Sequence, residues 1–157
     1  MATNFLANLT RKPHLNYVIM KKYLAIAGFL LFFASGGFSQ TVENAGRRTI
    51  GYISASGTVE NASRSTIGYI NPDGTIENSS RRTLGYIRKD GTVENASRST
   101  IGYIRSNGTV ENSSRSTIGY VQTSGTVENS SRKTIGYAKG ITTENAALFF
   151  FFFFKPE

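Results

Sequence analysis

The chain has 157 residues, with 18 basic and 10 acidic side chains, a formal net charge of +8 and no cysteine. Without cysteine it has no disulfide, no thiolate ligand for a metal and no lipid attached to a cysteine after a signal sequence. The one histidine, His14, lies near the N-terminus, far from the repetitive part of the chain. Zinc sites and histidine-dependent catalysis therefore lose their usual residues, and we expect no metal and no cofactor.

The N-terminal part of the chain differs from the rest. Residues 1–19 share no wording with the remainder, and we interpret them as an upstream extension from a mis-assigned start, with Met20 as the start. Residues 20–39 contain two lysines, an apolar run from Tyr23 to Ala34 and small residues near Ser39, the order of a secretory signal peptide. The apolar run is short for the roughly 20 residues of a membrane-spanning helix. We predict cleavage after Ser39.

An exported protein follows from this leader. We expect it to be secreted, or held in the periplasm or cell envelope, and not to be a lipoprotein anchored through cysteine. Four basic residues lie in the leader, Arg11, Lys12, Lys21 and Lys22, and without it 14 basic and 10 acidic residues remain, a net charge of +4. Most of the apparent basicity belongs to the leader, so we expect no nucleic-acid partner.

From Thr41 onward the chain repeats itself every 17 residues. Fixed-period self-similarity predicts a repeat architecture, which we assign to residues 40–147. A shortened copy is expected to begin at Thr143. The full copies open with Thr-Val-Glu-Asn or Thr-Ile-Glu-Asn at Thr41, Thr58, Thr75, Thr92, Thr109 and Thr126.

Each repeat is predicted to form a β-hairpin. In the second copy, residues 58–60 and 65–70 are rich in Thr, Val, Ile and Tyr, which favour strands, and alternation places Gly68 and Ile70 on the face opposite Ile67 and Tyr69. Asp-Gly and Asn-Gly between copies are strong turn signals. Within a copy, Asn-Ala-Ser or Asn-Ser-Ser is expected to turn the chain with its asparagine in the left-handed conformation. No 3.6-residue periodicity indicates a helix.

Hairpins this short are marginal alone in water, so they must pack together. Turns at both ends of each strand pair favour an all-β fold in which the tandem hairpins close into a shallow, pseudo-symmetric barrel without free edges. The alternative is an open β-solenoid with one repeat per rung.

Three residue types recur in every copy and have structural and functional interpretations. The glycines mark either a place without room for a side chain or a β-bulge. The tyrosines suit half-buried packing, or platforms for sugar rings. The arginines, four residues after a glutamate, suit surface ion pairs, or a ring that binds anionic headgroups or sugar acids. They are Gly51, Gly68, Gly85, Gly102, Gly119 and Gly136; Tyr52, Tyr69, Tyr86, Tyr103, Tyr120 and Tyr137; Arg47, Arg64, Arg81, Arg98, Arg115 and Arg132.

Residues 148–157 form a phenylalanine-rich tail. Soluble proteins avoid exposing so large an apolar patch, and six residues cannot span a bilayer as a helix. We expect the rings to fill the centre of the barrel. The alternatives are contact with a membrane surface and an interface with another copy, which would make the protein an oligomer. The run consists of Phe149, Phe150, Phe151, Phe152, Phe153 and Phe154.

Signal, repeats and tail stand in a distinctive order. A leader ending in Phe-Ser-Gln runs into TVENA and RRTIGYI, then into tandem DGTVEN and TIGY units, and closes with AALFFFFFFKPE. From Met20 to the C-terminus, this order resembles the bacterial five-fold β-flower proteins. The resemblance implies a shallow barrel of radiating hairpins with no established biochemical activity. The chain has six Gly-Tyr cores, whereas the family name specifies five, so either terminal units stay outside the ring or the number of hairpins differs.

The repeated residues contain no unique set of nucleophile, base and orienting group, so we expect no enzyme activity and no catalytic residues. The expected function is that of an exported, non-enzymatic β-repeat protein that binds a partner or forms part of the cell envelope. One alternative is a module that associates with a membrane surface through its phenylalanine tail and arginines. Another is a multivalent carbohydrate-binding protein.

Overall fold

The computed structural model describes residues 39–154, so the predicted leader, apart from Ser39, lies outside the described residues. These residues form twelve strands of four or five residues, followed by two short helical elements. The strands are β1 (Gln40–Asn44), β2 (Thr49–Ile53), β3 (Thr58–Asn61), β4 (Thr66–Ile70), β5 (Thr75–Asn78), β6 (Thr83–Ile87), β7 (Thr92–Asn95), β8 (Thr100–Ile104), β9 (Thr109–Asn112), β10 (Thr117–Val121), β11 (Thr126–Asn129) and β12 (Thr134–Tyr137).

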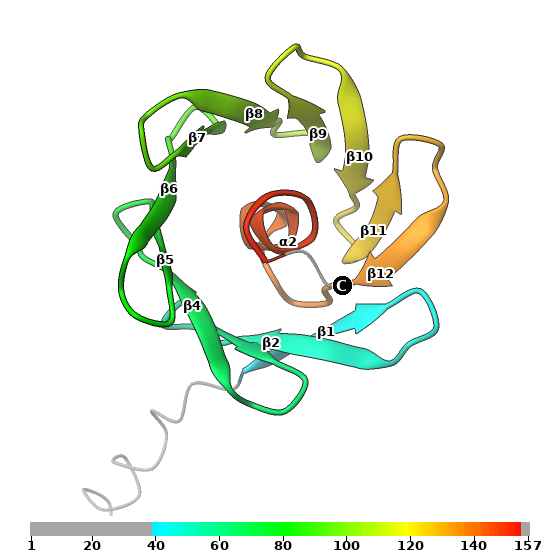
Figure 1. The fold of residues 1–157 in the computed structure, drawn as a ribbon. Helices are drawn as coiled ribbons and strands as arrows, with labels where there is room; N and C mark the ends of the chain where they lie inside the picture. The colour runs from blue at the N-terminus through cyan, green and yellow to red at the C-terminus, as the bar shows by residue number, and fades with distance from the viewer. Residues whose placement is uncertain (1–38, 155–157) are drawn as a thin grey trace, which may run out of the picture. The chain divides into compact units, whose positions relative to one another are not determined.

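The twelve strands form one closed barrel around a central helical segment (Figure 1). Consecutive strands pair along the chain, and β1 closes the ring by pairing with β12 through Glu43 opposite Tyr137 and Asn44 opposite Gly136. The predicted all-β barrel of tandem hairpins is therefore confirmed, and the open solenoid is excluded. All six full copies join the ring, so it has six hairpins.

Each hairpin contains a β-bulge immediately before its recurring glycine. In the first hairpin Val42 pairs with Gly51 while Glu43 pairs with Thr49, which leaves Ile50 as the additional residue. The register shifts at the equivalent place in the other five hairpins. A bulge bends its strand and increases the local twist, which helps short strands curve into a closed wall.

Two sets of turns alternate around the ring. The tip turns, residues 45–48, 62–65, 79–82, 96–99, 113–116 and 130–133, join the two strands of one hairpin. The linking turns, residues 54–57, 71–74, 88–91, 105–108 and 122–125, join successive hairpins. Because neighbouring strands run antiparallel, the tip turns lie at one end of the barrel wall and the linking turns at the other.

The left-handed residue differs between the two sets. In the linking turns it is the glycine, as at Gly74 with a φ of 86°. In the tip turns it is the arginine, with φ between 61° and 64° in all six copies. The prediction that the asparagine adopts this conformation was wrong. The asparagine side chain instead accepts hydrogen bonds at the start of the turn: Asn61 Oδ1 lies 3.0 Å from the backbone nitrogens of both Ser63 and Ser65.

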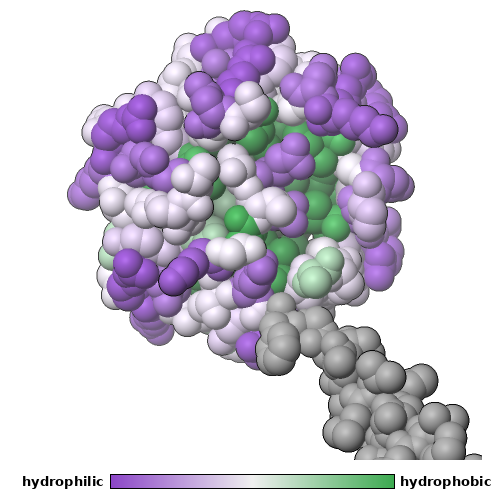
Figure 2. Space-filling model, turned by 180° about the vertical axis from the view of Figure 1, so that it is seen from behind, coloured by the Kyte–Doolittle hydropathy of each residue, from purple (hydrophilic) through white to green (hydrophobic). Residues whose placement is uncertain are grey.

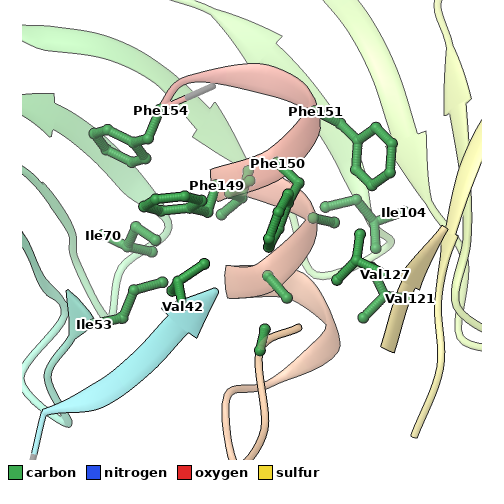
Figure 3. Close-up of a cluster of buried hydrophobic side chains, with 14 of the residues drawn as sticks. Val42, Ile53, Ile70, Ile104, Val121, Val127, Phe149, Phe150, Phe151 and Phe154 are labelled. Atoms are coloured by element: carbon green, nitrogen blue, oxygen red, sulfur yellow. The ribbon is translucent and has the colours of Figure 1, made fainter. Parts of the chain in front are cut away.

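The inner wall of the barrel is lined by short aliphatic side chains (Figure 3). As predicted, Gly68 and Ile70 are buried on the same side, whereas Ile67 and Tyr69 are partly exposed. The valine or isoleucine that follows the first threonine of every odd-numbered strand is completely buried. These residues are Val42, Val59, Ile76, Val93, Val110 and Val127.

The chain then enters the barrel as α2 (Thr143–Ala147) and the π-helical turn η2 (Leu148–Phe152). Thr142 caps α2, its hydroxyl accepting from Asn145 N at 3.2 Å. The shortened strand copy expected at Thr143 is therefore not found. A closed barrel offers no free edge to pair with, so this backbone forms its hydrogen bonds within itself. Neither helical element of residues 39–154 is long and apolar enough to cross a membrane.

Candidate functional site

The six phenylalanines of the tail lie in the centre of the barrel, the placement favoured by the sequence. Each ring lies against the recurring glycine of a different hairpin. Along the chain the contacts pass once around the ring, one hairpin per residue. The pairs are Phe149 with Gly51, Phe150 with Gly136, Phe151 with Gly119, Phe152 with Gly102, Phe153 with Gly85 and Phe154 with Gly68.

Both explanations offered for the recurring glycine hold, because it follows a bulge and also lacks room for a side chain. A Cβ atom on Gly51 would lie 2.7 Å from the Glu60 carbonyl oxygen and 2.9 Å from Phe149 Cζ. Such distances require the backbone or the ring to move. The six recurring glycines therefore leave the space that the six aromatic rings occupy, and we call each such position a glycine seat.

Burial of these rings bears on the suggestion that all six contact lipid. Phe149, Phe150, Phe151 and Phe154 are at most 8% exposed, and Phe152 and Phe153 are partly buried. Side chains enclosed in this way do not present a continuous apolar surface. In this arrangement the tail is the core of the barrel, and only Phe152 and Phe153 retain appreciable exposure.

The arginine and tyrosine columns meet at the seams between neighbouring hairpins. The Arg64 guanidinium carbon lies 3.4 Å from the centre of the Tyr52 ring in the preceding hairpin, and its Nη1 lies 3.2 Å from Glu60 Oε2. The same stacking recurs at all six seams. The other pairs are Arg47 with Tyr137, Arg81 with Tyr69, Arg98 with Tyr86, Arg115 with Tyr103 and Arg132 with Tyr120.

These contacts assign a structural role to both columns. The arginines of the five glutamate pairs remain 55–65% exposed, so each ion pair contributes at most about 1 kcal/mol. A guanidinium over an exposed aromatic ring adds about 0.5–1 kcal/mol. Because the guanidinium covers one face of each tyrosine, that face is not open to stack on a sugar. Sequence reasoning treated the columns separately, although in five copies the tyrosine precedes its arginine by 12 residues.

Two seams differ because arginines from the linking turns join them. Glu94 is 2% exposed and forms salt bridges with both Arg88 and Arg98. Glu111 pairs with Arg105 at 2.6 Å, while Arg115 lies farther from its tyrosine, at 4.4 Å from the Tyr103 ring centre.

The hydrogen bonds donated by the Arg105 guanidinium hold the pKa of the Glu111 carboxyl below its usual range and raise the pKa of Arg105 itself. Asymmetry thus enters this repetitive molecule through its linking turns.

Differences between the copies are concentrated in the linking turns. Before their glycine these turns contain Ser-Ala-Ser, Asn-Pro-Asp, Arg-Lys-Asp, Arg-Ser-Asn and Gln-Thr-Ser. The tip turns, in contrast, vary only between Ala and Ser, Gly and Ser, or Arg, Lys and Ser. Loops that differ on a constant scaffold are where repeat proteins commonly place recognition.

Two crevices lie between the linking turns and the beginning of α2. The larger has a volume of about 550 Å³ and extends over the turns 54–57, 71–74 and 88–91, and the smaller, of about 460 Å³, lies beside 105–108. Lys89 and Glu144 line both. Figure 2 shows apolar side chains in hollows between polar ones on one face of the molecule.

The architecture and the sequence comparison agree. A family model described as 5-fold beta-flower protein matches residues 39–154. The chain belongs to this family. No curated protein and no solved structure matches it. With six hairpins closed around six phenylalanines, this β-flower departs from the number in the family description.

The acidic residues of the linking turns of this β-flower serve the backbone. Asp73 and Asp90 accept hydrogen bonds from the backbone nitrogens of Thr75 and Thr92, and these bonds lower the pKa of each carboxyl. Within residues 39–154 no group of three His, Cys, Asp or Glu residues is placed to hold a metal. The crevices are lined by hydrogen-bonding groups and by side chains of both charges.

Proposed function

We propose that the protein is an exported, non-enzymatic β-flower that binds an acidic glycan of the cell envelope through its linking turns. The observation that carries this proposal is the distribution of sequence differences. The strands and tip turns are nearly the same in all six hairpins. The linking turns at one end differ in the size, charge and hydrogen-bonding groups of their side chains. A uniform scaffold with one diverse end is the arrangement of a binding protein.

The chemistry of the crevices favours a polar, partly anionic ligand. Asn71, Ser56 and Thr142 provide hydroxyl and amide groups that can donate to and accept from sugar hydroxyls. Lys89, which lines both crevices, provides a cation for a carboxylate. Isoleucines, such as Ile70 and Ile87, form an apolar floor for the less polar faces of sugar rings.

The absence of catalytic activity is part of the proposal and rests on symmetry. The recurring glutamates, tyrosines and left-handed arginines of the strands and tip turns come in six copies, which are engaged in stacking or ion pairs. An enzyme site usually brings together residues in distinct roles, and the crevice residues include no histidine or cysteine.

A binding assay with a matched control tests the proposed site. The triplets at 71–73, 88–90 and 105–107 are replaced by Ser-Ala-Ser, the triplet already present at 54–56, so that the scaffold keeps a turn it uses elsewhere. Polygalacturonate serves as the acidic glycan. We expect immobilised polygalacturonate to retain the starting protein and to retain the Ser-Ala-Ser replacement much less. The control Arg82→Ser, which copies the residue found in other tip turns, should be retained as well as the starting protein. Retention unaffected by the replacement, or no retention by the starting protein, contradicts the proposal.

Export has its own test. Intact mass measurement of protein recovered from outside the cytoplasm should show a chain beginning at Gln40, because the predicted signal peptide ends at Ser39. A full-length chain in the exported fraction, or no exported protein, would contradict this part of the proposal.

Membrane association is a second candidate, favoured by the partly exposed Phe152 and Phe153 and by the basic tip turns. Flotation with vesicles containing anionic lipid distinguishes it from glycan binding. Flotation that is lost in Phe152→Ser/Phe153→Ser and unchanged by the Ser-Ala-Ser replacement would support the membrane candidate over the linking-turn site.

A further inference from the structure

The hydrogen-bonded ring of the barrel contains no strand from the C-terminal segment. β1 pairs with β12 to complete the ring, and residues 143–154 add no strand to it. The hydrogen bonds of this segment run within it or to its cap, as from Phe153 N to Leu148 O and from Ala146 N to Thr142 O. In residues 39–154, no hydrogen bond joins it to a strand. The segment is thus a separate object inside a wall that is already complete.

Apolar packing holds the segment in place. Ala146, Ala147 and Leu148 are completely buried, and Phe149 is 1% exposed. Burial of this kind, with internal backbone hydrogen bonds, resembles an amphipathic peptide in an apolar groove more than an additional element of the sheet.

The barrel also sets a specific pattern for what fills it. Each hairpin presents a glycine seat, and each seat receives one ring from consecutive residues. Phe149 and Phe150 start the circuit on either side of the closing seam between β1 and β12, and Phe154 ends it at Gly68. A segment with missing rings would leave seats empty, and empty apolar volume is unfavourable.

Only a short stretch connects wall and segment. Residues 138–142 lead from β12 to α2, and in this stretch Lys139, Gly140 and Thr142 are exposed. Such a position is open to a protease once it carries a recognition sequence.

From these observations we propose that the barrel is a receptor for a peptide carrying six consecutive aromatic residues, and that residues 143–154 are its ligand, held in the same chain. The covalent connection supplies local concentration rather than structure. This binding site is the lumen of the ring. The beginning of the segment also lines the linking-turn crevices through Thr143, Glu144 and Asn145, but the lumen proposal does not depend on the glycan proposal.

Cutting the connection in the full-length protein tests the proposal. A specific protease site is inserted after Gly140, and the uncut variant is first checked for the circular dichroism spectrum and unfolding midpoint of the parent. After cleavage, we expect the fragment containing residues 141–157 to co-elute with the barrel on size exclusion and to separate only in denaturant. A second variant with the site inserted after Lys139 guards against a local effect of the insertion.

The matched control carries Phe150→Ser and Phe151→Ser with the same protease site. It leaves two seats unfilled, and we expect its fragment to separate from the barrel after cleavage, or to exchange at least tenfold faster against a fluorescent peptide of residues 141–157. Separation of the parent fragment under native conditions overturns the proposal. Equal retention of parent and control fragments overturns the specific role of the seats. Elution as a dimer after cleavage, with fragments exchanged between copies, supports it.

Discussion

The tip turns and the linking turns reverse the same chain six and five times, yet one set is nearly uniform and the other is diverse. At a tip turn two residues have fixed partners. The asparagine that precedes the turn accepts two backbone hydrogen bonds, and the arginine within it contacts the neighbouring hairpin. In a linking turn the glycine alone supplies the left-handed backbone, and a small acceptor such as Asp73 or Asn107 stabilises the strand that follows. The two positions before that acceptor are free to differ. Structural necessity therefore constrains one end of the barrel and leaves the other end available for function.

The largest expected effect comes from the scaffold on which this comparison rests. Gly85→Val should destabilise the protein by roughly 3 kcal/mol, because even the added Cβ would overlap the Glu94 carbonyl and come within 2.5 Å of Phe153 Cζ. Gly46→Ala is the control, since its Cβ would meet only Asn44 Oδ1 at 3.5 Å, and should change stability by less than about 0.5 kcal/mol. Urea denaturation measures both. Equal effects would show that the seats are not close-packed.

A pair of asparagines compares the two sets of turns directly. Asn112→Ala, at the end of β9 and next to a tip turn, removes the acceptor for the backbone nitrogens of Ser114 and Ser116, and should cost about 1.5 kcal/mol. Asn107→Ala in a linking turn removes one bond, to Thr109, and should cost about 0.5 kcal/mol. Unfolding free energies of the two variants give the ratio. A larger loss at Asn107 would reverse the assignment of scaffold and variable end.

The arginine of the tip turns carries both strain and contacts, which two substitutions separate. Arg132→Ala loses the stacking on Tyr120 and the pair with Glu128 but keeps the left-handed backbone, and should cost about 1 kcal/mol. Arg132→Gly loses the same contacts but relaxes the backbone, so it should be the more stable of the two. Thermal unfolding of the pair measures the difference. If alanine is the better residue, backbone strain is not significant there.

Acid should have the smallest effect. The pKa values of Asp73, Asp90 and Glu111 are lowered by hydrogen bonds in the folded protein. A lowered folded pKa contributes stability above the unfolded value, and this contribution is lost as the pH falls through the folded value. The unfolding midpoint should therefore be level from pH 7 to about 5 and decline below about pH 4. Glu111→Gln should decline less steeply. A midpoint that rises in acid would contradict this assignment.

Much of the fold could be predicted because the same pattern of strands and turns occurs in six repeats. Strand pattern, turn glycines and the need to remove free edges led to the closed barrel, and the apolar tail led to its filled centre. The left-handed arginines could not be found in this way, because propensity favours asparagine there and the side chain of Asn61 is instead used as an acceptor.

The candidate site was less accessible to sequence reasoning. The sequence pattern pointed to recurring residues, such as Arg64 and Tyr52, as candidate site residues, but these side chains stack on each other at the seams between hairpins. The crevices are formed by residues that do not recur, such as Lys89, together with Glu144 of α2. The sequence Thr-Glu-Asn at the start of α2 resembles the start of the strand repeats, so sequence alone did not indicate a helix there. The informative positions were those that differ between the repeats. Their importance is visible only in the structure, where the ring places all of them at one end of the barrel.

Because each of the six consecutive phenylalanines contacts the glycine of a different hairpin, the number of phenylalanines in the tail is linked to the number of repeats. A duplication that adds one repeat creates a glycine seat with no ring to fill it, and loss of one repeat leaves a ring with no seat. A change in the number of repeats is therefore neutral for packing only when the run of phenylalanines lengthens or shortens by one residue at the same time. The length of the tail records the number of hairpins that the barrel must have.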